Sequence, residues 1–416
     1  MQVNRDGTPL HLTYCLNIHP GETWAAQRAV ITGPATAVRE RLGWAEPFGL
    51  GLRLGAQAVA DLQAPEARLD LAETLASGDF YAFTINGFPY GTFHGTRVKE
   101  AVYAPDWSTP ERLTYTLRLA AILAELLPAG VTGSISTVPG TYRAWATPDR
   151  LEALAANLAA AALDLADLEE RRGRRVVLAL EPEPDCLWDE TALTIDGFEE
   201  VILRRGAAWL QRRRGGSREA AEAILRRHLG VCLDTCHQAV LGEDPSAALQ
   251  ALQSRGIAVN KIQISAAPCF QTSPEGLKQA SRFQDGCYLH QSTLITASAR
   301  RRYADLPEAL AAAHALAEPG ELRTHMHIPL VLAGGPGYIS SRQGLDLAFW
   351  KIVAGGVAPH VEVETYTFDV LPPELRGQTA VESIAGELSW VRCQLAATGG
   401  IPAPPASSGA GDRAPA

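Results

Sequence analysis

The stretch Arg175-Val-Val-Leu-Ala-Leu-Glu-Pro-Glu-Pro184 is the one around which the rest of the chain is organised. It has the apolar composition of a short buried strand, and it ends in a carboxylate, Glu181, just before a proline that cannot continue the ladder. Successive side chains on a strand point to opposite faces, so Val177, Ala179 and Glu181 share one face. A buried acid is costly unless it is paired or bound to a metal, so Glu181 calls for a partner rather than a role in core packing.

Short β-like runs alternate with helical periodicity along the whole chain. The predicted strands are 12–18, 48–54, 80–86, 131–137, 176–181, 231–234, 259–265 and 361–366, and the predicted helices are 23–42, 65–76, 110–127, 148–172, 194–214, 218–229, 245–255, 306–317, 343–353 and 371–395. Eight βα units are the number that closes a parallel barrel. We therefore predict an α/β fold with a single (β/α)₈ TIM barrel over residues 1–397. A doubly wound open sheet is the alternative, but no G-x-G-x-x-G follows the first strand.

Two regions fall outside this repeat. An insertion between the seventh and eighth strands, at about 266–332, contains an irregular part, 266–304, and a β-like run, 321–332. Long loops of this kind are usually functional or disordered, and the aromatic and histidine content predicts an ordered lid over the C-terminal edge of the sheet. Residues 398–416 are rich in Gly, Pro, Ala and Ser and predict a disordered C-terminal tail.

The composition limits the class of protein. With 416 residues, 46% of them hydrophobic and 20% charged, the chain can bury a large core. A net charge of −9 argues against a nucleic-acid partner, because phosphate binding requires clustered Lys and Arg. The seven cysteines form no C-x-x-C pair, which favours a reducing compartment. No signal peptide or membrane span is visible, so we expect a cytoplasmic protein without membrane insertion, of undetermined oligomeric state, acting on a small molecule.

Polar residues follow several of the predicted strands. Active sites of such barrels lie at the carboxyl ends of the strands, where Glu181, Asp234, Gln263 and Glu364 would meet. Divalent cations need several oxygen or imidazole ligands converging on one point. The sequence therefore predicts a metal site formed by the three acids, completed by Gln263 or a histidine. Pairing of the acids with arginines at helix ends is the alternative.

Three histidines are candidates for the same site. His237 follows Asp234 by three residues, so it can be a metal ligand, a substrate contact or a hydrogen-bonded turn residue. His325 and His327 alternate along the β-like run of the insertion and would face one side of it, as in a two-histidine ligand arm. A packed or exposed edge strand explains this pair equally well.

Further polar residues near the first three strands are candidates for substrate binding. Asn17 and His19 follow strand one with the same parity, and Asn86 ends strand three. They are predicted to contact substrate hydroxyl or carboxylate groups, and Arg53 on strand two to clamp an anion. Trp24 can wall a pocket or pack on the barrel rim.

The motifs Leu-Ala-Leu-Glu181-Pro and Leu-Asp234-Thr-Cys-His237, with the strand that carries Glu364, resemble the xylose-isomerase-like TIM-barrel superfamily of sugar isomerases, epimerases and endonuclease-IV-type enzymes. Over residues 8–395 the chain more closely resembles the EboE "metabolite traffic" proteins. This second resemblance rests on three motifs, Leu-Thr-Tyr-Cys-Leu-Asn17-Ile-His19-Pro-Gly-Glu-Thr-Trp24, Thr-His325-Met-His327-Ile-Pro-Leu and Glu362-Val-Glu364-Thr-Tyr-Thr-Phe-Asp-Val-Leu-Pro.

The superfamily resemblance implies a divalent metal held by Glu, Asp, His and Glu on strands five to eight. At matching positions this chain has Glu181, Asp234 and Glu364, but Gln263 stands where histidine is usual. The fourth ligand would then be Gln263, or His325 or His327 from the insertion. The resemblance also implies that the two glutamates act as acid and base. The EboE resemblance implies a bacterial gene cluster linked to metabolite export, without a defined reaction.

These features together predict a divalent-metal-dependent isomerase or epimerase acting on a small polyhydroxy carbonyl compound, with Zn, Mn, Mg or Co as the metal. Glu181 and Glu364 would remove and return a proton, and His237 would stabilise the oxyanion. A metal-dependent hydrolase of the endonuclease-IV-like branch is one alternative. A non-catalytic protein that binds a metabolite and hands it to an exporter is another.

Overall fold

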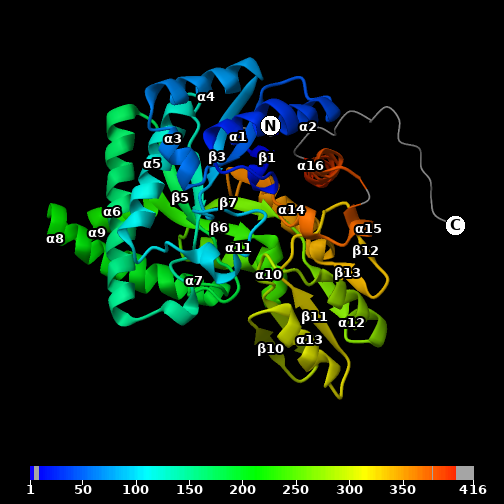
Figure 1. The fold of residues 1–416 in the computed structure, drawn as a ribbon. Helices are drawn as coiled ribbons and strands as arrows, with labels where there is room; N and C mark the ends of the chain where they lie inside the picture. The colour runs from blue at the N-terminus through cyan, green and yellow to red at the C-terminus, as the bar shows by residue number, and fades with distance from the viewer. Residues whose placement is uncertain (4–8, 377, 400–416) are drawn as a thin grey trace.

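Eight parallel strands form a barrel in the computed structural model, which describes residues 1–3, 9–376 and 378–399 (Figure 1). The strands are β1 (His11–Tyr14), β2 (Phe48–Arg53), β3 (Phe80–Asn86), β4 (Gly133–Thr137), β5 (Val176–Leu180), β6 (Leu229–Asp234), β7 (Val259–Ile264) and β14 (His360–Val363). Their order is β1-β14-β7-β6-β5-β4-β3-β2, and a parallel bridge between Cys15 and Gly51 joins the two ends. The predicted (β/α)₈ barrel is confirmed.

Helices surround the barrel, as Figure 1 shows. They are α1 (Trp24–Val30), α2 (Thr36–Arg41), α3 (Ala56–Asp61), α4 (Pro65–Ser77), α5 (Pro110–Leu126), α6 (Pro148–Arg172), α7 (Thr191–Gly197), α8 (Ala207–Arg214), α9 (Arg218–His228), α10 (Thr235–Leu241), α11 (Pro245–Ser254), α14 (Leu347–Ala354), α15 (Pro373–Arg376) and α16 (Ala380–Ala397). Several begin as their sequences predict. Thr147 and Asp244 accept hydrogen bonds from the first turns of α6 and α11, each followed by proline at the first helical position.

Some boundaries differ from the prediction. β1 ends at Tyr14 and β14 at Val363, where the sequence predicts strands to 18 and 366. The Glu364 N–H nevertheless donates to Ile264 O (3.1 Å), and the Glu181 N–H to Thr137 O (2.9 Å). The backbone therefore stays in the parallel ladder as far as both acids. The predicted helix 371–395 is divided into α15 and α16, because Thr379 and Glu382 form a capping box that starts a new helix.

The insertion forms a second sheet, and here the prediction of an irregular segment 266–304 is wrong. Six strands pair in the order β10-β9-β11-β8-β13-β12, all antiparallel. They are β8 (Pro268–Gln271), β9 (Ser292–Thr296), β10 (Arg300–Tyr303), β11 (Gly320–Thr324), β12 (Gly334–Gly335) and β13 (Tyr338–Ser340), with helices α12 (Pro274–Ala280) and α13 (Leu306–His314). In Figure 1 this sheet projects from one end of the barrel.

The predicted strand 321–332 is also wrong in its extent. β11 ends at Thr324, and the Met326 N–H turns back to Thr324 O (2.9 Å). The Ile328 N–H then donates to Ala266 O (2.9 Å). His325 and His327 consequently lie on an irregular segment that leaves the insertion and returns to the barrel.

A buried ion pair fills the barrel beneath the strand ends. Lys261 Nζ lies 2.5 Å from Glu362 Oε2, and neither side chain is exposed. The Lys261 ammonium also lies 3.3 Å from Ser136 Oγ. Glu362 fits because Gly51 opposite has no side chain, since a Cβ there would lie 1.8 Å from Glu362 Oε1. This layer is the floor of the site described next.

The predicted disordered tail, 398–416, lies outside the described residues from 400 onward. Among the helices that the structure describes, none combines the length and apolarity that crossing a bilayer requires.

Candidate metal centre

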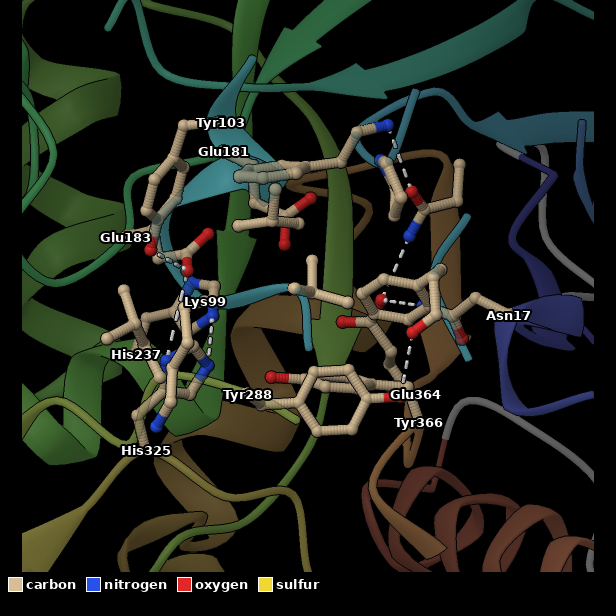
Figure 2. A pocket seen from close by; sticks show the side chains of 17 residues that line it. Asn17, Lys99, Tyr103, Glu181, Glu183, His237, Tyr288, His325, Glu364 and Tyr366 are labelled. Carbon is tan, nitrogen blue, oxygen red and sulfur yellow. Dashed lines mark hydrogen bonds and ion pairs between the residues drawn. The ribbon is translucent and has the colours of Figure 1, made fainter. Parts of the chain in front are cut away.

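A pocket with an empty volume of about 500 Å³ opens at the carboxyl ends of the barrel strands (Figure 2). Its walls come from the barrel strand ends, the β3–α5 loop and the insertion. The lining residues are Asn17, Asn86, Phe88, Pro89, Phe93, Val98, Lys99, Val102, Tyr103, Glu181, Glu183, His237, Tyr288, Leu289, His325, Glu364 and Tyr366. Figure 2 shows Glu183, His237 and His325 on one side and Asn17 and Glu364 on the other.

Three acids at the ends of separate barrel strands converge, and two of them, Glu181 and Glu364, line the pocket. Carboxylate oxygens of Glu181, Asp234 and Glu364 lie within 4.8 Å of one another, and all three residues are buried. Glu181 Oε2 and Asp234 Oδ2 have no hydrogen-bond partner in the described part of the chain. The structure therefore brings together the three acids that the sequence placed at strand ends.

Glu364 is held by two amides. The side-chain nitrogens of Asn17 (2.7 Å) and Asn86 (2.9 Å) both donate to Glu364 Oε1. Both asparagines line the pocket, as expected for substrate contacts, but their N–H groups point to the acid. Their observed contacts orient Glu364 and leave its Oε2 facing other groups.

The two carboxylate oxygens of Asp234 have different surroundings. Oδ1 accepts from Ser265 Oγ (2.7 Å) and from the N–H groups of Cys236 (2.7 Å) and His237 (3.0 Å), which caps α10. Oδ2 remains buried without a partner within the described ranges. One oxygen thus fixes the side chain, and the other faces Glu181 and Glu364.

The acids shift one another's protonation. Burial raises the pKa of Glu181 well above its usual value, and the charges of Glu364 and Asp234 add to this effect. Burial and the charge of Asp234 likewise raise the pKa of Glu364. Burial also acts to raise the pKa of Asp234, but His237, His327 and the Ser265 hydrogen bond outweigh it and lower that pKa.

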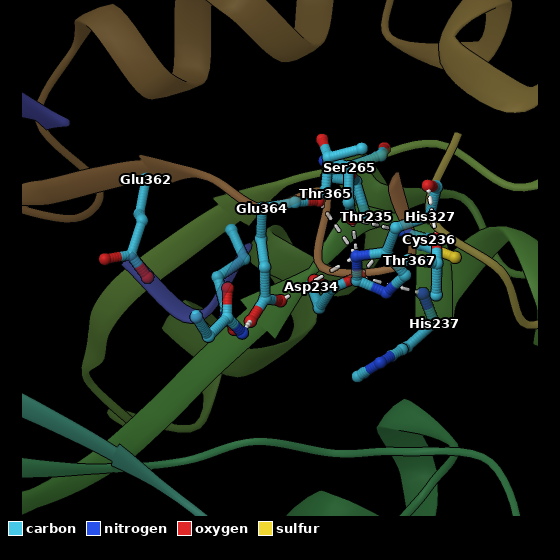
Figure 3. Close-up of polar contacts among 12 residues, drawn as sticks. Asp234, Thr235, Cys236, His237, Ser265, His327, Glu362, Glu364, Thr365 and Thr367 are labelled. Atoms are coloured by element: carbon cyan, nitrogen blue, oxygen red, sulfur yellow. Dashed lines mark hydrogen bonds and ion pairs between the residues drawn. The ribbon is translucent and has the colours of Figure 1, made fainter. Parts of the chain in front are cut away.

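His327 presents an unpaired nitrogen next to the acids (Figure 3). Its Nδ1 lies 2.9 Å from the Glu364 carbonyl oxygen, which can only accept, so Nδ1 carries the hydrogen. The lone pair is then on Nε2, which is buried without a partner among described residues. Burial lowers the pKa of His327 to about 4, so the ring is neutral. A neutral imidazole with a free Nε2 is the form that binds metals.

His237 and His325 form a second group with Glu183. His237 Nε2 lies 3.1 Å from His325 Nε2, and ligand atoms of the two histidines and Glu183 fall within 4.8 Å of one another. Asp234 also groups with His237 and His327 in this way, so it is shared between two sets of ligand atoms. Figure 3 shows Asp234 between Glu364 and His237.

Glu183 is a pocket residue that the sequence analysis missed. It accepts a hydrogen bond from Tyr103 OH (2.7 Å), and burial raises its pKa to about 7. The Glu-Pro-Glu-Pro repeat was the available signal, since it places a second acid just beyond Glu181. Tyr366 was also missed, although it shares the parity of Glu364; its ring centroid lies 4.8 Å from that of His327.

Three predicted substrate contacts lie outside the pocket lining. Arg53 is buried, pairs with Glu22 (2.8 Å) and donates to two backbone carbonyl oxygens, so it joins two loops instead of facing the pocket. His19 bonds with Tyr14 OH (3.2 Å), and Trp24 Nε1 donates to Asp70 (2.8 Å). The alternation of side chains along a strand predicts which face a residue lies on, but it does not predict which loop covers that face.

Gln263 is buried level with Asp234 and Glu362 in the sheet. Its Oε1 accepts from Cys232 Sγ (2.8 Å), and its Nε2 has no described partner. The amide oxygen that would bind a cation is thus engaged, and the group left over is a donor.

Neither a protein-family model nor a curated protein matches this sequence. Among solved structures, the chain is similar to the IolI protein with a bound zinc atom, at 13% identity and a TM-score of 0.49 over 94% of this chain and 99% of that one. It is similar to the probable 3-DHS dehydratase AsbF from Bacillus anthracis, at 10% identity and 0.42 over 91% and 97%. A xylose isomerase domain protein from Alicyclobacillus acidocaldarius aligns at 12% identity and 0.42 over 94% and 100%. At such low identities and scores, we infer function from the chain's own residues.

Proposed function

We propose that this protein is a divalent-metal-dependent enzyme that isomerises or epimerises a small polyhydroxy carbonyl compound. One observation carries the metal site: Glu181 Oε2, Asp234 Oδ2 and His327 Nε2 are buried without partners in the described chain. Leaving such groups unsatisfied costs free energy, and a cation held by the three acids would satisfy Glu181 and Asp234, with His327 within reach of Asp234. Lys261 does not satisfy these groups, because its ammonium is already paired with Glu362.

The ligand set we propose is Glu181, Asp234, Glu364 and His327. His327 is preferred over Gln263 as the nitrogen ligand, because its lone pair is free while the Gln263 oxygen is engaged. Three carboxylates and one imidazole suit Zn, Mn or Co better than they suit Mg, which prefers ligands that are all oxygen. His325 belongs to the neighbouring group with His237.

The surrounding residues can position a substrate and move its proton. A divalent cation at this site would polarise a carbonyl group and a neighbouring hydroxyl group. Glu181 and Glu364 both line the pocket, and we propose that they take a proton from one carbon and return it to another or to the opposite face. His237, also in the lining, directs its Nδ1 hydrogen to the Pro182 carbonyl oxygen (2.8 Å), so it would act on the developing oxyanion through a proton taken up on Nε2. The rings of Tyr288 and Tyr366 would limit access of water.

Metal binding is the first test of this proposal. Purified protein stripped of metal is expected to gain about 2.7 kcal/mol of unfolding free energy when Zn²⁺, Mn²⁺ or Co²⁺ is present at about 100 times its dissociation constant. The variant Asp234→Asn removes one of the proposed ligands. Its affinity for the metal should therefore fall by more than the roughly 10–100-fold that is lost when only a hydrogen-bond partner of a ligand is removed. Asparagine is an equally good N-cap, so α10 should persist.

The matched control is Asp244→Asn, which makes the same change at the cap of α11, away from the pocket. It should bind metal like the unmodified protein. If no divalent metal binds the unmodified protein, or if both variants bind equally well, the proposed site does not exist. The reaction itself can be tested by incubating the metal-bound protein with a panel of aldoses and ketoses in D₂O. Transfer of solvent deuterium to a carbon atom of one sugar, and loss of this transfer in Glu181→Gln, would identify the proton-transfer reaction.

A metal-dependent hydrolase is the second candidate, favoured by the group of Glu183, His237 and His325. Two nitrogen ligands of a tetrahedral zinc ion lie about 3.3 Å apart, close to the 3.1 Å between the two Nε2 atoms. A cation at this group, next to one held by the three acids, would suit hydrolysis of a phosphate ester. Two equivalents of zinc, together with phosphatase but no isomerase activity, would decide for this function. A cytoplasmic location and the link to metabolite export stay predictions.

A further inference from the structure

Gln291 connects the insertion to the pocket from the position just before β9. Its side chain is 1% exposed. The amide nitrogen donates to Tyr103 OH (2.6 Å) and to the Pro184 carbonyl oxygen (3.1 Å), and the amide oxygen lies 2.9 Å from His325 Nδ1. The Gln291 carbonyl oxygen also accepts from the His325 N–H (2.8 Å). Gln291 thus contacts two barrel loops and a histidine of the pocket.

These contacts determine which end of the amide faces which neighbour. The Pro184 carbonyl oxygen can only accept, so the amide nitrogen must face it, and the amide oxygen must face His325. That oxygen accepts the hydrogen of Nδ1. The lone pair of His325 therefore lies on Nε2.

The facing histidine is fixed in the same way. His237 Nδ1 lies 2.8 Å from the Pro182 carbonyl oxygen, so its hydrogen is on Nδ1 and its lone pair on Nε2. The two lone pairs then face each other across 3.1 Å. Two such lone pairs repel unless a proton or a metal ion lies between them. Figure 2 shows the two rings together beside Glu183.

Gln291 also orients Tyr103. Because the Tyr103 oxygen accepts from Gln291, its single hydrogen is directed to Glu183 Oε1, 2.7 Å away. Glu183 lies in the same ligand group as the two histidines. One buried amide therefore sets the hydrogen positions on two sides of the group.

We propose that Gln291 is a positioning residue that holds His325 in the tautomer whose Nε2 lone pair faces His237. The insertion then completes the site, because Gln291, just before β9, prepares a nitrogen for a cation. The tautomer follows from the chain's own hydrogen bonds, whereas its benefit for cation binding rests on the second cation site, at Glu183, His237 and His325, that is part of the proposed function. Loss of such an outer partner typically weakens metal binding roughly 10–100-fold.

The test is ¹⁵N NMR of the histidine rings in the metal-free full chain, with His325 assigned through His325→Asn. The unmodified protein should show a protonated Nδ1 on His325. In Gln291→Leu this nitrogen has no acceptor, so the hydrogen should move to Nε2 and be donated to His237. Gln291→Glu keeps an oxygen facing Nδ1 and should retain the original tautomer, although its carboxylate faces the Pro184 carbonyl. A purely structural role for Gln291 would not produce this rescue.

A Co²⁺ titration of the same proteins completes the experiment. Gln291→Leu should bind Co²⁺ at the histidine group roughly 10–100-fold more weakly than the unmodified protein. An unchanged His325 tautomer in Gln291→Leu, or a changed one in Gln291→Glu, would overturn the inference. A changed tautomer with unchanged Co²⁺ affinity would overturn the role in cation binding. If the unmodified protein binds no Co²⁺ while the tautomers change as expected, the proposed function fails and the positioning of His325 stands.

Discussion

Gly51 is the residue on which the space inside the barrel depends. An added Cβ would lie 1.8 Å from Glu362 Oε1 and 3.0 Å from the Tyr14 carbonyl oxygen. Glu362 cannot turn away without breaking its 2.5 Å contact with Lys261. Gly51→Ala is therefore expected to lower the free energy of unfolding by about 1–3 kcal/mol, as overpacking of a filled core does.

Denaturant unfolding measures this difference, and Gly344→Ala provides the control. A Cβ at Gly344 meets no described atom within 4 Å apart from its chain neighbours, and the residue is exposed in a 3₁₀ helix, Ser341–Gly344. Alanine there should be neutral or stabilising by up to about 1 kcal/mol. Equal stabilities of the two variants would show that the buried ion pair does not occupy the space that Gly51 leaves.

Single residues also show where sequence reasoning succeeds and where it ends. Glu181, Asp234 and Glu364 could be placed together because the carboxyl ends of parallel strands meet at one edge of a barrel. The partners of Asn17 and Asn86 could not be predicted, since parity gives the direction of a side chain but not the atom it reaches. Both amides bind Glu364, a contact across 347 and 278 residues of chain.

The insertion shows the same limit at the scale of elements. Its strands are two to five residues long, and β8 pairs with β11 and β13, which lie far along the chain. Such short antiparallel strands give little periodicity, and their pairing is not local. The barrel strands were predictable because apolar runs and intervening helices repeat along the chain. The contact of Gln291 with His325 could not have been found without the pairing of β9 with β11.

The insertion is fastened to the β3–α5 loop by Lys99. Its Nζ lies 2.6 Å from Asp305 Oδ2, and the N–H groups of Val98 and Lys99 donate to Cys287 O (2.8 and 3.0 Å). Partly exposed ion pairs contribute at most about 1 kcal/mol. Lys99→Met is expected to accelerate hydrogen exchange of these two amides about fivefold, because the loop opens more often.

Arg97→Met is the matched control, since Arg97 is an exposed cation of the same loop. Its exchange rates should equal those of the unmodified protein. If Lys99→Met leaves both amides as protected as before, the ion pair does not hold the loop against the insertion.

At the scale of the whole molecule, the last helix, α16, is joined to the barrel through the buried carboxyl group of Glu387. Glu387 is fully buried and accepts from the Leu330 N–H (3.0 Å), Thr365 Oγ1 (2.7 Å) and Ser383 Oγ (3.2 Å). It thereby joins the last helix to the end of β14 and to the segment leaving the insertion. Burial raises the pKa of Glu387 to about 7, although all three hydrogen bonds act to lower it.

This raised pKa makes stability depend on pH in a definite direction. The folded protein holds the Glu387 proton more tightly than the unfolded chain, whose carboxyl has a pKa near 4.5. Its contribution is therefore fully present below about pH 4.5 and is lost as the pH rises through about 7. The difference of 2.5 pKa units, from 4.5 to about 7, corresponds to roughly 3 kcal/mol.

Glu387→Gln removes the titrating group while keeping an oxygen to accept hydrogen bonds. As the pH rises from about 4.5 to 8, the unfolding free energy of the variant should increase by about 3 kcal/mol relative to that of the unmodified protein. The reason is that the buried carboxyl group loses its proton over this range, whereas the amide of glutamine does not titrate. Denaturant unfolding in the presence of chelator at several pH values measures the difference and excludes metal linkage. A difference between the two proteins that stays constant over this range would show that Glu387 titrates normally, and that α16 seals the barrel through apolar packing alone.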